Sequence, residues 1–353
     1  MRTHRTLLIG TAGTALALLL GIQLIPAPLA QLEASPSGFA RYPYGGATLN
    51  GWIAESYAET GAGDLPAFTS WLEDTYWADS SVHWKGVADL TEALRRIRAD
   101  LQRTAGVDQR SALEREAAAW LHRVTKRLIP RFSIERGYEF AYTVRYGERQ
   151  CFLQSVLLAA LLQGAGIEAG TYMVWRNDKG QTTNNGHATA FARLSNGRDI
   201  LVDASYPEPF VRHQGVFVRH GDTYRFAEPL YAADGTITGY RASRRAIPLG
   251  TIQGLDEAFL RSQFYFYRGE HAPGGWLAKP STPQGLARSA THMEQAQRLN
   301  PGNPLAVYVL GHVYRKQNRI ADAKEQYRRA HRLYDSYGYV PAGPADAYRW
   351  ATR

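Results

Sequence analysis

Cysteine is almost absent from this chain, because its 353 residues include only Cys151. A single thiol cannot form an intrachain disulfide, so a small scaffold held together by disulfides is excluded. Charged residues make up 21% of the sequence and hydrophobic residues 44%, which is typical of a globular chain and not of a disordered one. The length allows one large domain or two modest ones with a sizeable core.

Cofactor motifs are also missing from the sequence. No phosphate loop or dinucleotide fingerprint precedes a predicted helix, so we expect no nucleotide cofactor. Six histidines show no ligand spacing with cysteine or acidic residues, so we expect no metal site. They are His213, His220, His271, His292, His312 and His331.

The net charge of +9 is unevenly spread. Residues 276–353 hold 12 Lys or Arg against 5 Asp or Glu. Such an excess can attract anionic lipid, cell-wall polymer or nucleic acid. A solvated basic face on helices accounts for the same charge. We favour that interpretation, and we do not expect a nucleic-acid partner.

Residues 1–30 have the pattern of a targeting segment. A basic end with Arg2 and Arg5 precedes a long uncharged stretch, which suits either a cleaved signal peptide or a membrane anchor over residues 7–25. Cleavage after residue 30 would put Pro28 at the −3 position, which suits signal peptidase poorly, so the sequence favours the anchor. Both alternatives predict an extracytoplasmic protein, periplasmic or secreted.

The lone cysteine stands where a nucleophile would. Cys151 follows a polar run and opens the apolar run 151–162, so the sequence predicts that its sulfur lies on the first turn of a helix. The unpaired N–H groups and the positive dipole end there favour thiolate over thiol. In an exported protein such a thiol is either an inert buried residue or a working nucleophile.

A histidine and an aspartate follow on predicted strands. His187 opens the strand 187–194, and Asp203 ends the strand 199–203. Taken singly, such a histidine is usually a structural hydrogen-bonding residue, and such an aspartate caps a strand end. Together with Cys151, they give the chain order of one kind of cysteine acyl-transfer enzyme.

Four segments around these residues resemble the transglutaminase-like superfamily of papain-type cysteine enzymes. They are 148–151, 163–169, 187–191 and 201–204, and the resemblance covers about residues 110 to 210. It implies an α+β fold with a papain-like, transglutaminase-like core, in which an antiparallel sheet packs on a central cysteine-bearing helix. It also implies a catalytic triad of Cys151, His187 and Asp203. Two residues depart from the family pattern: Arg149 replaces a glycine, and Ala204 replaces a proline.

The rest of the chain divides around this core. We predict a linker over 31–50 and a transglutaminase-like domain over 51–270, elaborated at its N-terminal end by helices over 89–101 and from about 108 to 128.

The segment 281–335 is similar to a tetratricopeptide repeat with one extra helix. We predict helices over 285–299, 304–317 and 320–334, with Gly311 and Ala323 as the small residues that let paired helices approach closely. A protein partner could bind these helices.

The predicted triad would act on amide or isopeptide bonds of proteins or peptides. His187 would take the Cys151 proton while Asp203 orients the imidazole, and the backbone N–H of Cys151 would stabilise the oxyanion, with Gln150 or Tyr146 as a second donor. The triad leaves hydrolysis and transfer to an amine open. The alternative hypothesis is a non-catalytic binding or assembly protein that uses its helical tail to recognise a partner.

Overall fold

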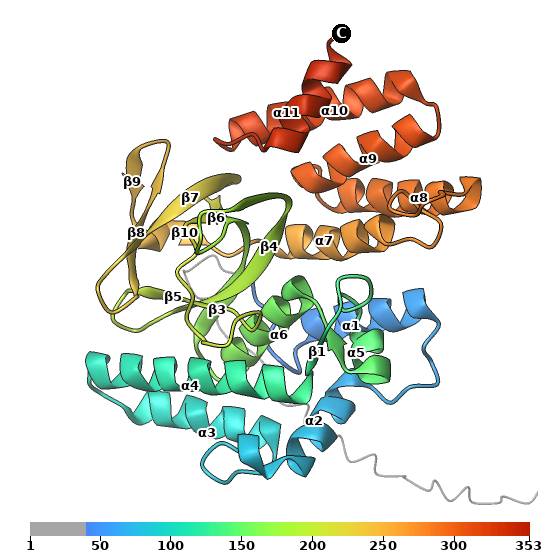
Figure 1. Cartoon of the computed structure of the whole chain (residues 1–353). Coiled ribbons are helices and arrows are strands. Elements are labelled where there is room, and N and C mark those ends of the chain that lie inside the picture. The colour runs from blue at the N-terminus through green and yellow to red at the C-terminus, as the bar shows by residue number, and fades with distance from the viewer. Residues whose placement is uncertain (1–39) are drawn as a thin grey trace, which may run out of the picture. The chain divides into compact units, whose positions relative to one another are not determined.

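The computed structural model describes residues 40–353, except for the side chains of residues 183–185. The predicted targeting segment and the first part of the predicted linker lie outside the described residues. Within residues 40–353, none of the helices combines the length and the apolar character that crossing a membrane requires. The described residues belong to a single unit, in which helices cover part of a β-sheet (Figure 1).

Eight strands form the main sheet, and six of them close it into a barrel. The eight are β3 (Glu168–Arg176), β4 (Thr182–Arg193), β5 (Asp199–Val202), β6 (Gly215–His220), β7 (Thr223–Tyr231), β8 (Ile237–Ala242), β9 (Arg245–Ile247) and β10 (Ile252–Gln253). The order around the barrel is β6, β3, β4, β5, β8 and β7, and pairing of β7 with β6 completes the ring. Strand β9 pairs with β8, and β10 pairs with β6.

The closed barrel overturns the predicted fold class. From the sequence we predicted a papain-like, transglutaminase-like core with an antiparallel sheet packed on the cysteine-bearing helix, and this prediction is wrong. Strand β6 pairs with both β3 and β7, and β5 pairs with β8 through Asp199 and Ile237, so the six strands form a ring. Alternating apolar residues identify each strand in the sequence, but they do not encode which distant strands pair.

Apolar residues cover both faces of the barrel wall, the inner and the outer. Inside, Tyr172 stacks on Phe191 with ring centroids 4.2 Å apart. On the outside, β4 contributes small residues to the cluster that includes helix α6 (Cys151–Gly164): Ala188, Ala190 and Ala192. Small side chains let the helix approach the strand closely. Residues Phe152–Leu162 of α6 are buried, so the exposed part of this helix near the site is its first residue.

Helices precede the barrel along the chain. Asp89 caps one of them through its side chain, which accepts a hydrogen bond from the Glu92 N–H at 2.6 Å. The two helices predicted over 89–101 and from about 108 to 128 are confirmed as α3 and α4. The elements before α6 are α1 (Ala47–Thr60), α2 (Phe68–Ala78), the 3₁₀ turn η1 (Ser80–Val82), α3 (Leu90–Arg103), α4 (Val107–Leu128), β1 (Arg131–Phe132), α5 (Phe140–Tyr146) and β2 (Glu148–Arg149).

Five helices follow the barrel and a short 3₁₀ turn, η2 (Leu249–Thr251). They are α7 (Glu257–Glu270), α8 (Pro283–Leu299), α9 (Pro304–Lys316), α10 (Ile320–Ser336) and α11 (Ala342–Ala351). The three predicted helices are confirmed as α8, α9 and α10. A Cβ atom on Gly311 would lie 2.6 Å from the Tyr327 ring, so α9 and α10 need a glycine where they meet. The tetratricopeptide resemblance stays a prediction.

The C-terminal helices pack directly on strand β7. Asn300 donates a hydrogen bond to the Tyr224 hydroxyl at 2.6 Å, and the Phe226 N–H donates to the Tyr337 carbonyl at 3.0 Å. The Tyr334 ring meets Trp175 of β3 edge to face, with centroids 5.6 Å apart. The helices and the barrel therefore share one apolar core.

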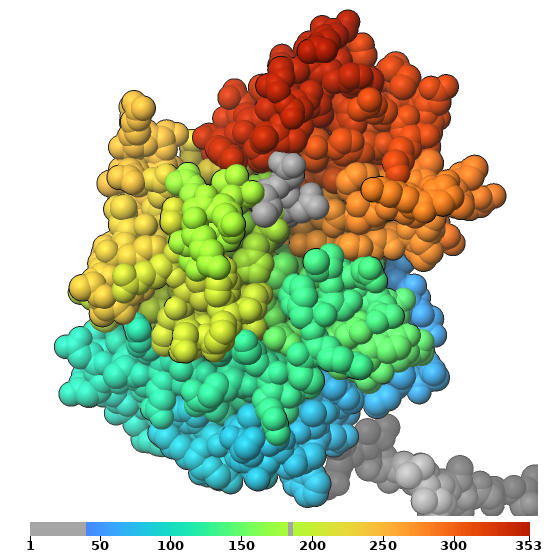
Figure 2. Space-filling model, viewed as in Figure 1, coloured from blue at the N-terminus to red at the C-terminus, as the bar shows by residue number. Residues whose placement is uncertain are grey.

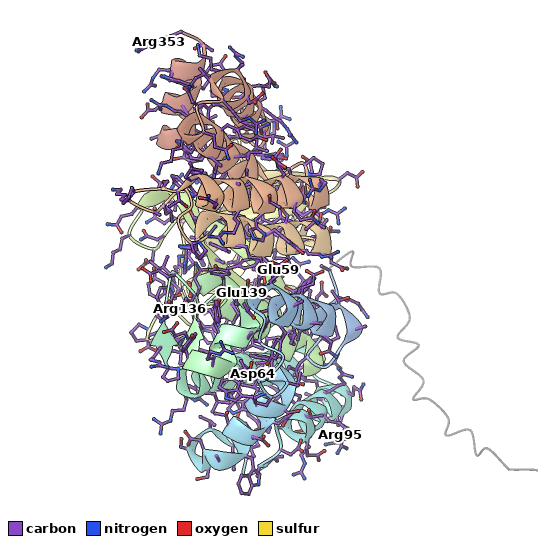
Figure 3. The ribbon with its side chains drawn as sticks, turned by 90° about the vertical axis from the view of Figure 1, so that its right-hand side faces the viewer. Glu59, Asp64, Arg95, Arg136, Glu139 and Arg353 are labelled. Atoms are coloured by element: carbon purple, nitrogen blue, oxygen red, sulfur yellow. The ribbon has the colours of Figure 1, made fainter. Side chains whose placement is uncertain are left out.

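A buried ion pair also ties α7 to the segment before α5. Arg268 Nε lies 2.7 Å from Glu139 Oε1, and the two side chains are 5% and 3% exposed; Glu139 is labelled in Figure 3. We expect Glu139→Ala to lower the free energy of unfolding by about 3–5 kcal/mol, because it leaves the guanidinium buried without its counter-charge. Urea denaturation measures the loss.

Asp346→Ala is the control for this prediction. It removes the partner of Arg349 in a pair whose side chains are 64% and 67% exposed. Solvent screens such a pair, so its loss should cost less than about 1 kcal/mol. Equal effects of the two substitutions would contradict a structural role for the buried pair.

Candidate active site

The predicted nucleophile begins a helix. Cys151 is the first residue of α6, and its side chain is half-buried. Gln150 precedes it with an extended backbone (φ −115°, ψ 163°), and the Gln150 side chain does not cap the helix. No Gln150 side chain therefore occupies the free N–H groups of the first turn. These groups and the positive end of the helix dipole can stabilise negative charge near the sulfur. The predicted helix start at Cys151 is confirmed.

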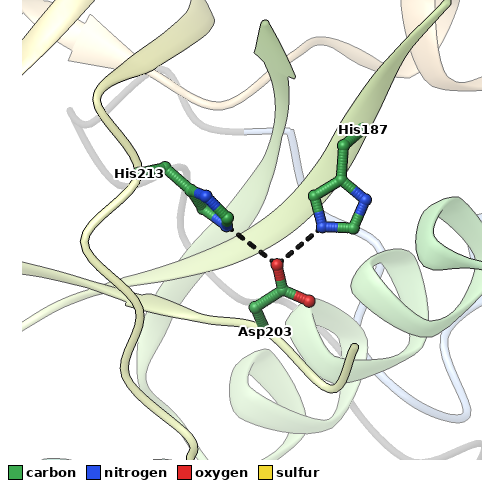
Figure 4. Close-up of side chains that lie close together, drawn as sticks. All are labelled: His187, Asp203 and His213. Carbon is green, nitrogen blue, oxygen red and sulfur yellow. Dashed lines mark hydrogen bonds and ion pairs between the residues drawn. The ribbon is translucent and has the colours of Figure 1, made fainter. Parts of the chain in front are cut away.

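His187 connects the cysteine with Asp203. Its Nε2 lies 2.7 Å from Asp203 Oδ2 (Figure 4), and the charge of the neighbouring Cys151 acts on its ring. Because Nε2 faces Asp203, Nδ1 is the ring nitrogen left for the sulfur. His187 lies on β4 and keeps 24% of its side chain exposed, whereas Asp203, directly after β5, is fully buried. The structure thus brings together the three residues singled out in the sequence.

A second histidine shares the same carboxylate oxygen. His213, from the segment between β5 and β6, is fully buried and places its Nε2 2.8 Å from Asp203 Oδ2. The other carboxylate oxygen accepts the Ser205 N–H at 2.9 Å. Three donors therefore fix the Asp203 carboxylate. His213 shows no ligand spacing in the sequence, and spacing could not reveal its contact with Asp203, since a bridge between Phe210 and Val202 folds this segment back beside β5.

The charges in this chain of contacts support one another. Burial disfavours the imidazolium form of His187, but the negative charges of Cys151 and Asp203 and the hydrogen bond to Asp203 outweigh it, so the pKa of His187 is raised well above 6.5. Burial also opposes ionisation of Asp203. The charge of His187 and hydrogen bonds from His187 and His213 nevertheless hold the pKa of Asp203 well below its usual range.

Two histidines and a carboxylate are also a set that metals can use. The ligand atoms of His187, Asp203 and His213 lie within 4.8 Å of one another. Both Nε2 atoms, however, contact the same Oδ2 at 2.7 and 2.8 Å, which are hydrogen-bond lengths. Donors about 2.0–2.2 Å from a tetrahedral metal would stand more than 3 Å apart. The observed arrangement fits direct hydrogen bonds better than a ligand set.

Arg149, one of the two departures from the family pattern, lies beneath the site. Its side chain is 5% exposed and donates hydrogen bonds to Gln154 Oε1 at 2.8 Å, to the Ala204 carbonyl at 3.3 Å and to the Ile129 carbonyl. Gln154 in turn donates to the Ser205 hydroxyl at 2.6 Å. Arg149 therefore joins the cysteine helix to the turn that carries Asp203. Ala204, the second departure, supplies one of the acceptors.

The two suggested oxyanion donors have other contacts. The Gln150 side chain is buried and donates to the Ile134 carbonyl at 3.1 Å. The Arg136 guanidinium lies over the Tyr146 ring, with its Cζ atom 4.7 Å from the ring centroid. Neither contact points to a role at the sulfur, which leaves the backbone N–H of Cys151 as the predicted oxyanion donor.

A pocket of about 330 Å³ opens beside the histidine; we call it the site pocket. Its size is within the range of small-ligand sites. Aromatic and amide side chains dominate its wall. The lining residues are Phe132, Val174, Trp175, Asn177, Gln181, His187, Ser205 and Tyr206.

Comparison with protein-family models, curated proteins and solved structures found no match to this chain, so the resemblance to transglutaminase-like enzymes stays a prediction that rests on the sequence motifs alone.

Proposed function

We propose that the protein is a cysteine-dependent acyl-transfer enzyme acting on amide or isopeptide bonds of peptides or proteins. The observation that supports this most strongly is the hydrogen bond between His187 and the buried Asp203, beside Cys151 at the start of helix α6. Perturbed titrating groups gathered beside a pocket are typical of catalytic sites. The targeting segment predicted over residues 1–30 would place this activity outside the cytoplasm.

In the first half-reaction, the Cys151 thiolate attacks the carbonyl carbon of the scissile amide. A C–S bond forms, and the carbonyl oxygen becomes an oxyanion that the Cys151 N–H stabilises. His187, protonated in the resting pair, gives its proton to the leaving nitrogen as the C–N bond breaks. The free amine departs, and a thioester remains on Cys151.

In the second half-reaction, neutral His187 takes a proton from the acceptor. Water then attacks the thioester and releases a carboxylic acid, or an amine attacks it and forms a new amide. The C–S bond breaks, and the thiolate and imidazolium are restored. Asp203 keeps the same ring nitrogen oriented in both steps, because three hydrogen bonds fix its carboxylate.

The rate of iodoacetamide labelling tests this resting state, because Cys151 is the only thiol in the chain. We expect the thiol of the wild-type protein to be labelled readily at neutral pH. His187→Gln should slow labelling there, because the imidazolium that favours the thiolate is lost. Mass spectrometry of the labelled Cys151 peptide gives the rate at each pH.

His220→Gln serves as the matched control, since His220 lies on β6 and its ring makes no contact with the triad. It should leave the labelling profile unchanged. If the wild-type and His187→Gln proteins gave the same profile, Cys151 would be a structural thiol. The non-catalytic assembly protein would then be the better hypothesis.

A further inference from the structure

A second pocket of about 460 Å³ opens at the rim of the barrel. It lies between the ends of β3 and β8, the start of β6, the middle of β7 and the turn after α10, where Gly338 and Tyr339 line it. Figure 2 shows the hollow between the β8–β9 hairpin, in gold, and the C-terminal helices, in red. We call it the arginine pocket after Arg176, Arg241 and Arg244 in its wall.

Positive charge exceeds negative charge in this wall, where the three guanidiniums face one carboxylate, Glu228. Arg176 Nη1 lies 3.3 Å from Glu228 Oε1, and Arg241 directs Nε and Nη2 to Oε2 at 3.0 and 2.8 Å. Each guanidinium has five N–H donors. Between described residues, Arg176 donates one hydrogen bond and Arg241 donates two. The Arg244 side chain donates none there. Most of the donors are therefore available to an anion.

The backbone holds Arg244 in a conformation that arginine seldom adopts. Ser243 and Arg244 form the two-residue turn between β8 and β9, and both have positive φ, 47° and 67°. Such turns normally carry Asn-Gly or Gly-Gly, because a side chain at positive φ is strained. Non-glycine residues persist in such a conformation mainly at ligand clamps and other functional sites. Here the strained turn places Arg244 in the pocket wall.

An aromatic wall accompanies the arginines. The ring of Phe226 meets Trp175 and Tyr339 edge to face, each at a centroid distance of 5.2 Å. All three residues line the pocket. The lining therefore suits a ligand that combines an anionic group with an apolar side chain.

The arginine pocket and the site pocket share the β3–β4 hairpin. Trp175 lines both. Arg176 follows it into the arginine pocket, while Val174, one residue before Trp175, pairs with His187. Two residues along a strand span about 7 Å, so one short extended peptide could reach both pockets.

We infer that the arginine pocket binds an acidic side chain of a peptide, next to an apolar residue, while the same peptide presents its acyl group to Cys151. The identification of the peptide as a substrate rests on the proposed function, but its binding does not. A carboxylate is the expected anion because Glu228 already shows how these planar guanidiniums hold one.

Fluorescence anisotropy on the full chain carrying Cys151→Ala measures this binding without turnover. The probe is a fluorescein-labelled Gly/Ser heptapeptide with one Glu-Phe pair, compared with its Gln-Phe and phosphoserine-Phe counterparts. We expect the Glu-Phe peptide to bind about ten-fold more tightly than the Gln-Phe peptide, as for one charge-assisted hydrogen bond. Equal binding of the two, or tighter binding of the phosphoserine peptide, would overturn the assignment.

Two neighbouring arginines give the matched pair of variants. Arg244→Gln should weaken binding of the Glu-Phe peptide about ten-fold. Arg245→Gln, one residue later, exposed and outside the pocket lining, should leave it within about two-fold. Arg244→Gly should weaken binding equally and melt at a higher temperature, because it relieves the positive φ. Equal effects of Arg244→Gln and Arg245→Gln, or binding retained by Arg244→Gly, would contradict the proposal.

Discussion

Replacing Cys151 by alanine is expected to abolish turnover and leave the fold intact. The thiolate is the group that forms the C–S bond, and no second thiol can replace it. Loss of the nucleophile in a triad typically lowers kcat by about 10⁴-fold or more. Cys151 is half-buried at a helix end, so the substitution leaves no large cavity. Turnover is measured as amide hydrolysis and as incorporation of a fluorescent amine into a peptide mixture. The melting temperature reports whether the fold is intact.

Cys151→Ser separates the loss of the thiolate from the loss of the side chain. A serine hydroxyl nearly fills the space of the thiol but stays protonated at neutral pH. It should therefore be almost as inactive as the alanine variant. Full turnover by either variant at an unchanged melting temperature would contradict the assignment of Cys151 as the nucleophile.

Replacing Asp203 by alanine is expected to lower kcat by about 10²- to 10⁴-fold, because His187 can still act as acid and base but is less well oriented. His187 keeps its contact with the sulfur but loses the partner that orients its ring. The pH profile should change as well. The charge and hydrogen bond of Asp203 raise the pKa of His187 against burial, so their loss lowers that pKa. The imidazolium then disappears at a lower pH, and the alkaline limb of the rate profile should move to lower pH.

Asp222→Ala is the control, because its side chain is fully exposed in the turn between β6 and β7. It should change neither kcat nor the pH profile. A fall in kcat for Asp203→Ala with no shift of the alkaline limb would mean that Asp203 supports the fold around His187 without tuning its charge.

Local sequence patterns predicted the parts of the site that depend on local structure. Cys151 was identifiable because a polar run meets an apolar helix there, and Asp203 because it stands at the end of a strand. His187 was predicted to open its strand, but β4 begins at Thr182, so His187 lies inside the strand. His213 was missed because its contact with Asp203 depends on a segment that folds back beside β5. Arg149 was noticed only as a departure from a motif, whereas the structure shows it joining the cysteine helix to the Asp203 turn.

The fold shows the same division between local and distant contacts. Helices α8, α9 and α10 were predictable from the periodicity of apolar residues and from Gly311, which packs against Tyr327. The barrel was not predictable, since it depends on the pairing of β6 with β7 and of β5 with β8. Each strand looks the same in sequence whether its sheet is open or closed.

Trapping the acyl group on Cys151 would show whether this sulfur forms a covalent bond with the substrate. The wild-type protein is mixed with a peptide digest and quenched in acid within milliseconds to seconds, and its Cys151 peptide is analysed by mass spectrometry. We expect a thioester adduct in the wild-type protein, a longer-lived adduct in Asp203→Ala, and no comparable adduct in His187→Gln. Adduct levels in the wild-type protein no higher than in His187→Gln would contradict this expectation.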